Sequence, residues 1–182
     1  MGDSDTILVT GASGYIGGRL LRSFEEGGRA VRCLARDPAK VRASAATTEV
    51  VRGDCLDESS LGPALAGVGT AYYLVHSMEA GANFPELDQR AAGNFQRAAA
   101  RAGVRRIVYL GGLFGGTGSI SSHLKSRAEV GETLRSGGVP VIEFRASIVI
   151  GAGSLSFEMI RALVERLPVI CLLYTSDAAD EL

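Results

Sequence analysis

Short apolar runs alternate along the chain with longer segments in which apolar residues recur every three or four positions. The runs are apolar at nearly every position and rich in β-branched residues, which is typical of strands buried on both faces of a parallel sheet. The longer segments place their apolar residues on one face of a helix. We predict strands at 6–10, 30–35, 49–52, 70–75, 106–110 and part of 141–150, and helices at 15–26, 38–43, 58–65, 84–102, 121–136 and 156–167.

Strands and helices that alternate at this spacing form βαβ units, in which parallel strands pair and helices cover both faces of the sheet. The sequence therefore predicts an α/β protein with a doubly wound parallel sheet in a three-layer αβα arrangement. The helix expected at 156–167 begins a further unit that the sequence does not complete. We therefore expect the sheet to be incomplete at the C-terminus.

The last twelve residues, 171–182, differ in character from the rest of the chain. They contain no basic residue, and they resemble the in-frame translation of a transposase-type sequencing adapter. We expect residues 1–170 to form one domain and residues 171–182 to be a non-native tail. The alternative is an ordinary acidic C-terminus.

Composition narrows the classes of function. The chain has 182 residues, of which 46% are hydrophobic, and a formal net charge of −1. This balance favours a globular domain and argues against a nucleic-acid-binding protein that acts through bulk positive charge. Cys33, Cys55 and Cys171 lack the spacing of a zinc site or a disulfide framework, which fits the reducing cytoplasm. We find neither a signal-peptide pattern nor an apolar run long enough for a membrane span, and expect neither export nor membrane insertion.

Glycine is the outlier in composition, at 24 residues, nearly twice the usual share of about 7%. One cluster, T-G-A-S-G-Y-I-G-G at 10–18, directly follows the first predicted strand and opens a helix. In a loop with this spacing one glycine permits a tight turn, one lets the backbone approach a pyrophosphate, and one lets the helix pack on the strand. The helix N-terminus then faces the anion. We predict a dinucleotide-binding loop made by Gly11, Ser13, Gly14, Tyr15, Ile16 and Gly17.

The end of the second strand distinguishes the two nicotinamide cofactors. An acidic residue there accepts the ribose 2′-hydroxyl of NAD, whereas an arginine accommodates the 2′-phosphate of NADP. Arg36 comes first after the strand, and Asp37 stands before Pro38 in a position that suits a helix N-cap. We therefore favour NADP over NAD. In the alternative, Arg36 is a solvated surface charge and Asp37 contacts the ribose.

Two further candidates follow the third and fourth strands. Asp54 is placed either to accept a hydrogen bond from the adenine amino group or to begin the next turn. His76 follows the fourth strand, beside the point where ligands bind in open α/β sheets. We expect His76, Ser77 and Met78 to line the nicotinamide side. The alternative for His76 is a hydrogen bond to the nearby backbone.

With these residues in place, the chain resembles the atypical and extended branch of the short-chain dehydrogenase/reductase superfamily, and most closely its NmrA-like NAD(P)H-binding proteins. The resemblance implies a Rossmann-type NAD(P)-binding topology, and it implies that Asp54 and Cys55 lie in the segment that contacts adenine. Four segments carry the resemblance. Residues 10–17 resemble TGxxGxxG, and residues 51–56 resemble the GD segment. Residues 102–109 resemble AGVKRFVY, and residues 144–151 resemble LRPxxVYG.

The chain departs from this superfamily at the usual active site. That site has a serine near the end of the fifth strand and a YxxxK pair on the next helix, in which the tyrosine is the general acid/base and the lysine lowers its pKa. Alignment places Gly111 and Gly112 at the serine, His123 at the tyrosine and Arg127 at the lysine. Histidine titrates near neutral pH and Arg127 lies one helical turn further, so this pair is our candidate for proton transfer. The alternative is a histidine and an arginine exposed on a helix surface.

Two functions of different classes follow. The first is an NADP-dependent oxidoreductase of the atypical short-chain class that acts on an unidentified small-molecule substrate. The second is a non-catalytic NADP(H)-binding sensor or scaffold, which the missing serine, tyrosine and lysine favour. The glycine-rich run at 111–118 lacks the Lys-Ser/Thr of a phosphate-binding P-loop and predicts a mobile loop over the crevice.

Overall fold

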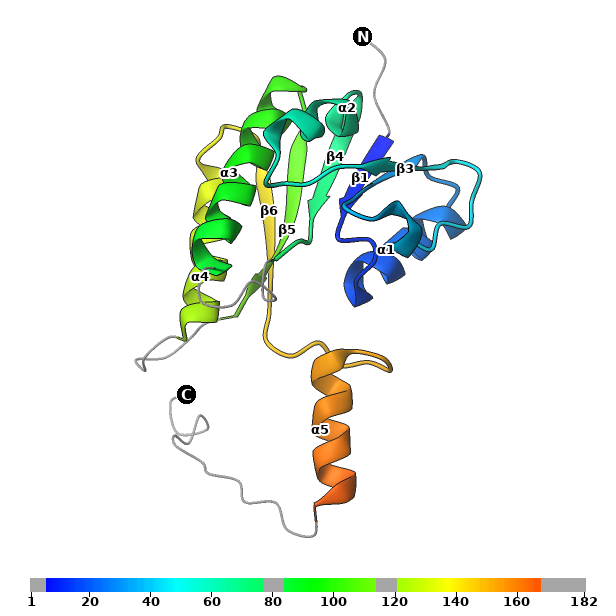
Figure 1. Ribbon diagram of the computed structural model, residues 1–182, viewed down its shortest axis with the longest axis vertical. Coiled ribbons are helices and arrows are strands. Elements are labelled where there is room, and N and C mark those ends of the chain that lie inside the picture. Colours follow the sequence, from blue (N-terminus) through cyan, green and yellow to red (C-terminus); the bar gives the residue numbers. More distant parts are fainter. Residues whose placement is uncertain (1–5, 77–83, 114–120, 168–182) are drawn as a thin grey trace, which may run out of the picture. The chain divides into compact units, whose positions relative to one another are not determined.

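The computed structural model describes residues 6–76, 84–113 and 121–167, in two compact units that divide after Ser147. The first unit contains a six-stranded sheet in the order β3-β2-β1-β4-β5-β6, with every neighbouring pair parallel (Figure 1). This is the strand order of the doubly wound Rossmann fold, which confirms the predicted α/β class. The strands are β1 (Thr6–Thr10), β2 (Val31–Ala35), β3 (Thr48–Arg52), β4 (Val68–Tyr73), β5 (Arg106–Gly112) and β6 (Val141–Ala146).

Helices pack on both faces of the sheet, as the sequence predicts. The helices of the first unit are α1 (Tyr15–Glu26), α2 (Leu61–Leu65), α3 (Phe84–Arg101) and α4 (Ser122–Arg135). Successive strand residues point to opposite faces, so β4 contributes to two cores. Tyr73 lies on the face of α3, where its ring centroid is 4.9 Å from that of Phe95. Tyr72 lies on the face of α1, where its ring centroid is 5.3 Å from that of Phe24.

One predicted helix is shorter in the structure than in the prediction, and another is divided in two. The segment at 38–43 forms only the 3-10 turn η1 (Pro38–Lys40), after which Val41 is extended. The segment at 58–65 divides into the 3-10 turn η2 (Glu58–Ser60) and α2, which contains Gly62 and Pro63. Glycine and proline both disfavour a continuous α-helix, and this accounts for the division.

The fourth strand was expected at 70–75, but β4 ends at Tyr73. Beyond it the N–H of Leu74 donates to Thr10 Oγ1 (2.9 Å), and that hydroxyl donates to the carbonyl of Tyr72 (3.0 Å). The Thr10 side chain therefore replaces the next strand partner. This contact draws the chain out of the sheet at the end of β4.

The second unit contains α5 (Leu155–Arg166), close to the helix expected at 156–167. Ser154, which precedes α5, is buried and donates to the carbonyl of Val149 (2.6 Å). None of the described helices combines the length and the apolar character needed to cross a lipid bilayer. The tail at 171–182 lies outside the described residues, as does most of the glycine-rich run at 111–118.

Candidate functional site

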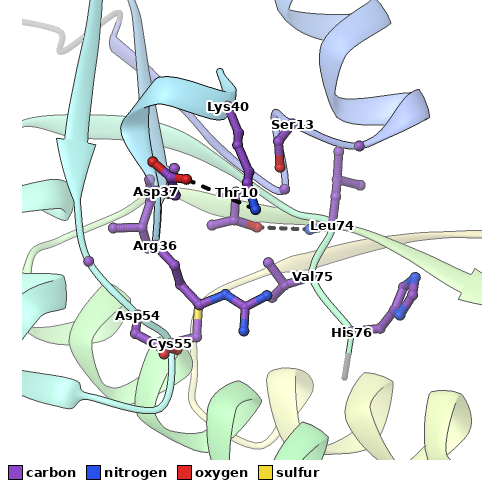
Figure 2. A pocket seen from close by; sticks show the side chains of 15 residues that line it. Thr10, Ser13, Arg36, Asp37, Lys40, Asp54, Cys55, Leu74, Val75 and His76 are labelled. Carbon is purple, nitrogen blue, oxygen red and sulfur yellow. Dashed lines mark hydrogen bonds and ion pairs between the residues drawn. The ribbon is translucent and has the colours of Figure 1, made fainter. Parts of the chain in front are cut away.

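A cavity of about 660 Å³ lies where the chain leaves the carboxyl ends of β1, β2, β3 and β4 (Figure 2). The strand order reverses between β1 and β4, and ligands of open α/β sheets bind at such a reversal. The volume falls within the range of roughly 300–1,000 Å³ that is usual for small-molecule sites. Seven of the predicted cofactor residues line this cavity, namely Gly11, Ser13, Gly14, Arg36, Asp54, Cys55 and His76.

The glycine loop between β1 and α1 forms a tight turn that only glycine accommodates at two positions. Gly11 has φ +70°, and a Cβ there would lie 2.8 Å from the carbonyl oxygen of Leu74. The N–H of Gly14 donates to the carbonyl of Gly11 (2.9 Å) and closes the turn. A Cβ on Gly17 would lie 2.2 Å from the oxygen of Gly11. Gly17 therefore serves the close packing of α1 on the loop.

The amino end of α1 borders the cavity through Ser13 and Gly14, which line it and precede the helix. The first N–H groups of a helix have no partner within the helix and carry positive partial charge. Gly14 is the N-cap, and no side chain of the described residues caps it. Tyr15 and Ile16 are half-buried on the first turn and do not line the cavity.

The segment after β2 brings two cations to the cavity. Arg36 is exposed and extends along the wall toward Cys55 (Figure 2). Asp37 accepts a hydrogen bond from the N–H of Ala39 (3.2 Å), which confirms it as the N-cap of η1. Lys40 also lines the cavity, with its Nζ 4.0 Å from the Asp37 carboxylate. Sequence reasoning missed Lys40, because only the turn of η1 brings it back over the loop.

The segment after β3 contributes Asp54 and Cys55. Asp54 Oδ1 accepts a hydrogen bond from the N–H of Leu56 (2.9 Å), so the carboxylate does begin a turn, and the residue also lines the cavity. The side chain of Cys55 is buried, and this burial raises the pKa of its thiol to about 12. Cys55 is therefore protonated at neutral pH and contributes an uncharged wall. Burial likewise raises the pKa of the Cys33 thiol to about 12.

His76 is exposed and lines the cavity, three residues beyond the end of β4. Ser77 and Met78, predicted beside it, lie outside the described residues. The described residues contain no cluster of three or more histidine, cysteine or acidic side chains suited to a metal ion. The cavity wall combines two cations, two carboxylates and an imidazole with hydroxyl and aliphatic side chains and the backbone of the glycine turn.

The other candidate pair, His123 and Arg127, does not line this cavity. His123 is half-buried at the start of α4, with its ring centroid 6.3 Å from that of Phe84. The guanidinium of Arg127 donates to the carbonyl of Leu110 and lies 5.6 Å from the ring centroid of Tyr109. The Tyr109 hydroxyl donates to the carbonyl of Arg127 (2.9 Å). Arg127 therefore connects α4 to β5.

Gly111 and Gly112, at the positions of the expected serine, are buried and closely surrounded. A Cβ on Gly111 would lie 2.6 Å from Glu143 Oε1, and a Cβ on Gly112 would lie 2.8 Å from Leu124 Cδ2. A serine at either position would displace one of these side chains. A serine would fit at either position once the end of that flexible side chain moved aside.

The fold and the cavity are those of the doubly wound α/β class. The chain belongs to the NmrA-like family, whose model matches residues 3–163. A curated relative is the (4-alkanoyl-5-oxo-2,5-dihydrofuran-3-yl)methyl phosphate reductase of Streptomyces griseus, 31% identical over 172 residues, which are 91% of this chain and 57% of the relative. Sterol demethylase protein B of Methylococcus capsulatus is 35% identical over 109 residues, 57% of this chain and 33% of the relative. The chain thus spans only part of the relatives that it matches.

Solved structures of reductases share the fold. Triphenylmethane reductase of Citrobacter sp. is 26% identical with a TM-score of 0.69, over 88% of this chain and 54% of that one. The NADPH-dependent quinone oxidoreductase of Escherichia coli, complexed with NADPH, is 29% identical with a TM-score of 0.66, over 78% of this chain and 49% of that one.

Proposed function

We propose that this chain is the cofactor-binding part of an NADP(H)-dependent oxidoreductase of the atypical short-chain class. The observation that carries the proposal is the cavity at the β1–β4 reversal, where the glycine turn, the amino end of α1, Arg36 and Lys40 surround one space. Backbone N–H groups at a helix N-terminus and side-chain cations are the groups that bind phosphates. The similar quinone oxidoreductase and triphenylmethane reductase structures are complexes with NADPH and NADP(H), which supports this cofactor class.

In this proposal the phosphates occupy two parts of the cavity. The pyrophosphate lies against the backbone of Gly11, Ser13 and Gly14, and Tyr15, Ile16 and Gly17 complete the helix turn behind them. The 2′-phosphate lies between Arg36 and Lys40. That both of these cations line the cavity supports NADP over NAD as the cofactor.

The remaining parts of the cofactor lie along the segments that follow β3 and β4. The adenine lies along Asp54 and Cys55, where Asp54 accepts from the adenine amino group with the carboxylate oxygen not used by Leu56. The nicotinamide lies on the side of His76.

The cofactor supplies the hydride, and the chain supplies binding, orientation and charge. The substrate is an unidentified small molecule, in keeping with the reductase activities in the names of the relatives. His123 is our candidate for proton transfer. Arg127, which contacts Leu110 and Tyr109, is a candidate for positioning it. We place the protein in the cytoplasm, because its cysteine pattern fits a reducing compartment.

Titration of the chain with NADPH and NADH, followed by cofactor fluorescence, tests the proposal. We expect NADPH to bind more tightly, and the Arg36→Gln/Lys40→Gln variant to weaken NADPH binding about a hundredfold or more, because each of two charge-assisted contacts to phosphate contributes about 1.5–3 kcal/mol. NADH binding should change far less in this variant. Arg42→Gln is the matched control, since Arg42 is exposed on the same segment and does not line the cavity. Equal binding of both cofactors, unchanged in the double variant, would refute the NADP assignment.

A second candidate function is a non-catalytic NADP(H)-binding sensor. The specific observation in its favour is that Glu143 and Leu124 fill the space of a serine side chain at Gly111 and Gly112. Cofactor turnover with a panel of carbonyl substrates separates the two functions. Turnover that His123→Ala abolishes supports the enzyme with His123 in proton transfer. Tight NADPH binding without turnover of any substrate supports the sensor.

A further inference from the structure

A second pocket lies at the opposite edge of the sheet, near the amino ends of β1, β4 and β5. Its volume is about 230 Å³. Ile7 and Val108 give it aliphatic walls, and the hydroxyl-bearing residues Thr70 and Tyr72 also line it. The cofactor cavity lies beyond the carboxyl ends of β1 and β4 and shares no lining residue with this pocket.

Three arginines, Arg29, Arg105 and Arg106, line this pocket, and no carboxylate among the described residues does. Neither Arg29 nor Arg106 forms an ion pair with any residue that the structure describes. Arg105 already has a partner, and other arginines of the described chain pair with carboxylates, as in Arg32–Glu49, Arg97–Glu58 and Arg135–Glu143. Arg29 and Arg106 are exposed, so water and salt screen part of the repulsion between them, and a bound anion would relieve the remainder.

We propose that this pocket binds a phosphate group, either as inorganic phosphate or as part of a small metabolite. A phosphate dianion neutralises more positive charge than a carboxylate, and its oxygens match the planar fork of a guanidinium. The pocket has the volume of roughly eight water molecules at about 30 Å³ each, which leaves room for a phosphate and a short carbon group. Ile7, Val108 and the Tyr72 ring give that carbon group an apolar surface.

Phosphate titration of the full chain, followed by amide NMR shifts at constant ionic strength, tests this assignment. We expect saturable shifts at Thr70, Tyr72 and Arg106. The Arg29→Gln/Arg106→Gln variant should raise the dissociation constant about tenfold or more, because it removes charge-assisted hydrogen bonds. The Arg36→Gln/Lys40→Gln variant is the matched control and should leave the shifts at Thr70 and Tyr72 unchanged, so a failure here is distinguishable from a failure of the cofactor proposal.

The lysine variant Arg29→Lys/Arg106→Lys keeps the charge without the fork, and we expect intermediate affinity. It keeps the test decisive if the glutamine variant does not fold. Glycerol 3-phosphate that binds more tightly than inorganic phosphate identifies a metabolite as the source, and the reverse order identifies free phosphate.

Three outcomes would overturn the proposal: no shifts at Thr70 and Tyr72, acetate binding as tightly as phosphate, or phosphate binding only after Asp3→Asn/Asp5→Asn. In the last case the acidic residues that precede β1 in the sequence neutralise the arginines.

Discussion

The cofactor cavity and the α4–β5 contact differ in what their polar side chains touch. In the cavity, Arg36 and Lys40 are exposed and border open space. At the α4–β5 contact, Arg127 donates to the carbonyl of Leu110 and packs on the ring of Tyr109, whose hydroxyl bonds back to Arg127. The first region leaves its charge facing an open cavity, whereas the second uses its charge to join a helix to a strand.

Glycine also has opposite effects in the two regions. Gly11 and Gly17 allow main-chain atoms to approach one another, which shapes the open turn beside α1. Gly111 and Gly112 leave their space to the side chains of Glu143 and Leu124. A glycine-rich sequence therefore predicts a ligand loop only where the glycines bring backbone together at the end of a strand.

The largest effect is expected from Gly17→Ala. The new Cβ would lie 2.2 Å from the carbonyl oxygen and 2.7 Å from the carbonyl carbon of Gly11, both main-chain atoms that cannot rotate away. We expect the free energy of unfolding to fall by about 3 kcal/mol, at the upper end of overpacking effects, and NADPH binding to be lost. Urea unfolding and the NADPH titration measure the two effects.

Gly62→Ala is the control for that variant, because a Cβ on Gly62 in α2 meets nothing within 4 Å. Alanine there should leave stability unchanged or raise it by up to about 1 kcal/mol. If Gly17→Ala unfolds and binds like the parent chain, the close packing of α1 on the loop is not what shapes the cavity.

The next effect concerns Arg127→Leu, which removes the contacts to Leu110 and Tyr109. We expect a loss of about 2 kcal/mol in the free energy of unfolding, from a charge-assisted hydrogen bond and a cation–π contact. NADPH affinity should be unchanged. Lys125→Leu on the same helix is the control, since Lys125 is exposed with only a 3.9 Å ion pair to Glu129, and we expect a change within about 0.5 kcal/mol. A loss of NADPH affinity without a loss of stability would move Arg127 into the cofactor site.

The difference between the cavity and the α4–β5 contact also explains which features can be predicted from the sequence. The helix at 15–26 is predicted to the residue, because Gly14 and Gly27 bound a clear amphipathic pattern. Arg36 and His76 are each predicted to contact the cofactor because they follow parallel strands whose carboxyl ends lie at one edge of the sheet, and both line the cavity. That Arg127 contacts Leu110 is not predictable, since it depends on the distance between α4 and β5. Lys40 was missed for a related reason, because a 3-10 turn and not a helix follows Asp37.

The helix predicted at 38–43 ends after Lys40, and a tertiary contact holds the residues that follow this segment. Glu25 at the end of α1 accepts hydrogen bonds from the N–H and the hydroxyl of Ser44 (3.0 and 2.6 Å), the N–H of Ala45 (3.1 Å) and the hydroxyl of Thr48 (2.7 Å). These contacts tie the extended segment after η1 to α1. No periodic pattern in the sequence records them.

The smallest effect is expected at this carboxylate, with a pH dependence of known sign. Burial raises the pKa of Glu25, but the hydrogen bonds from Ser44, Thr48 and the backbone outweigh it and lower the pKa from 4.5 to about 2. Because the folded-state pKa lies below the unfolded-state value, the stabilisation is fully present above pH 4.5 and is lost as the pH falls toward 2. We expect Glu25→Ala to lower the free energy of unfolding by about 1–2 kcal/mol at pH 7.

Urea unfolding of Glu25→Ala and the parent chain at pH 7 and at pH 3 measures this difference. The difference in free energy of unfolding between the two proteins should be smaller at pH 3. The parent then begins to lose the stabilisation by the Glu25 carboxylate, which the variant lacks at every pH. Glu26→Ala is the matched control, since Glu26 is exposed at the adjacent position. NADPH affinity should fall less than in Arg36→Gln/Lys40→Gln, because Glu25 holds the segment that carries Lys40 without lining the cavity. A gap that stays constant with pH would mean that the hydrogen bonds, and not the charge of Glu25, hold this segment beside the cavity.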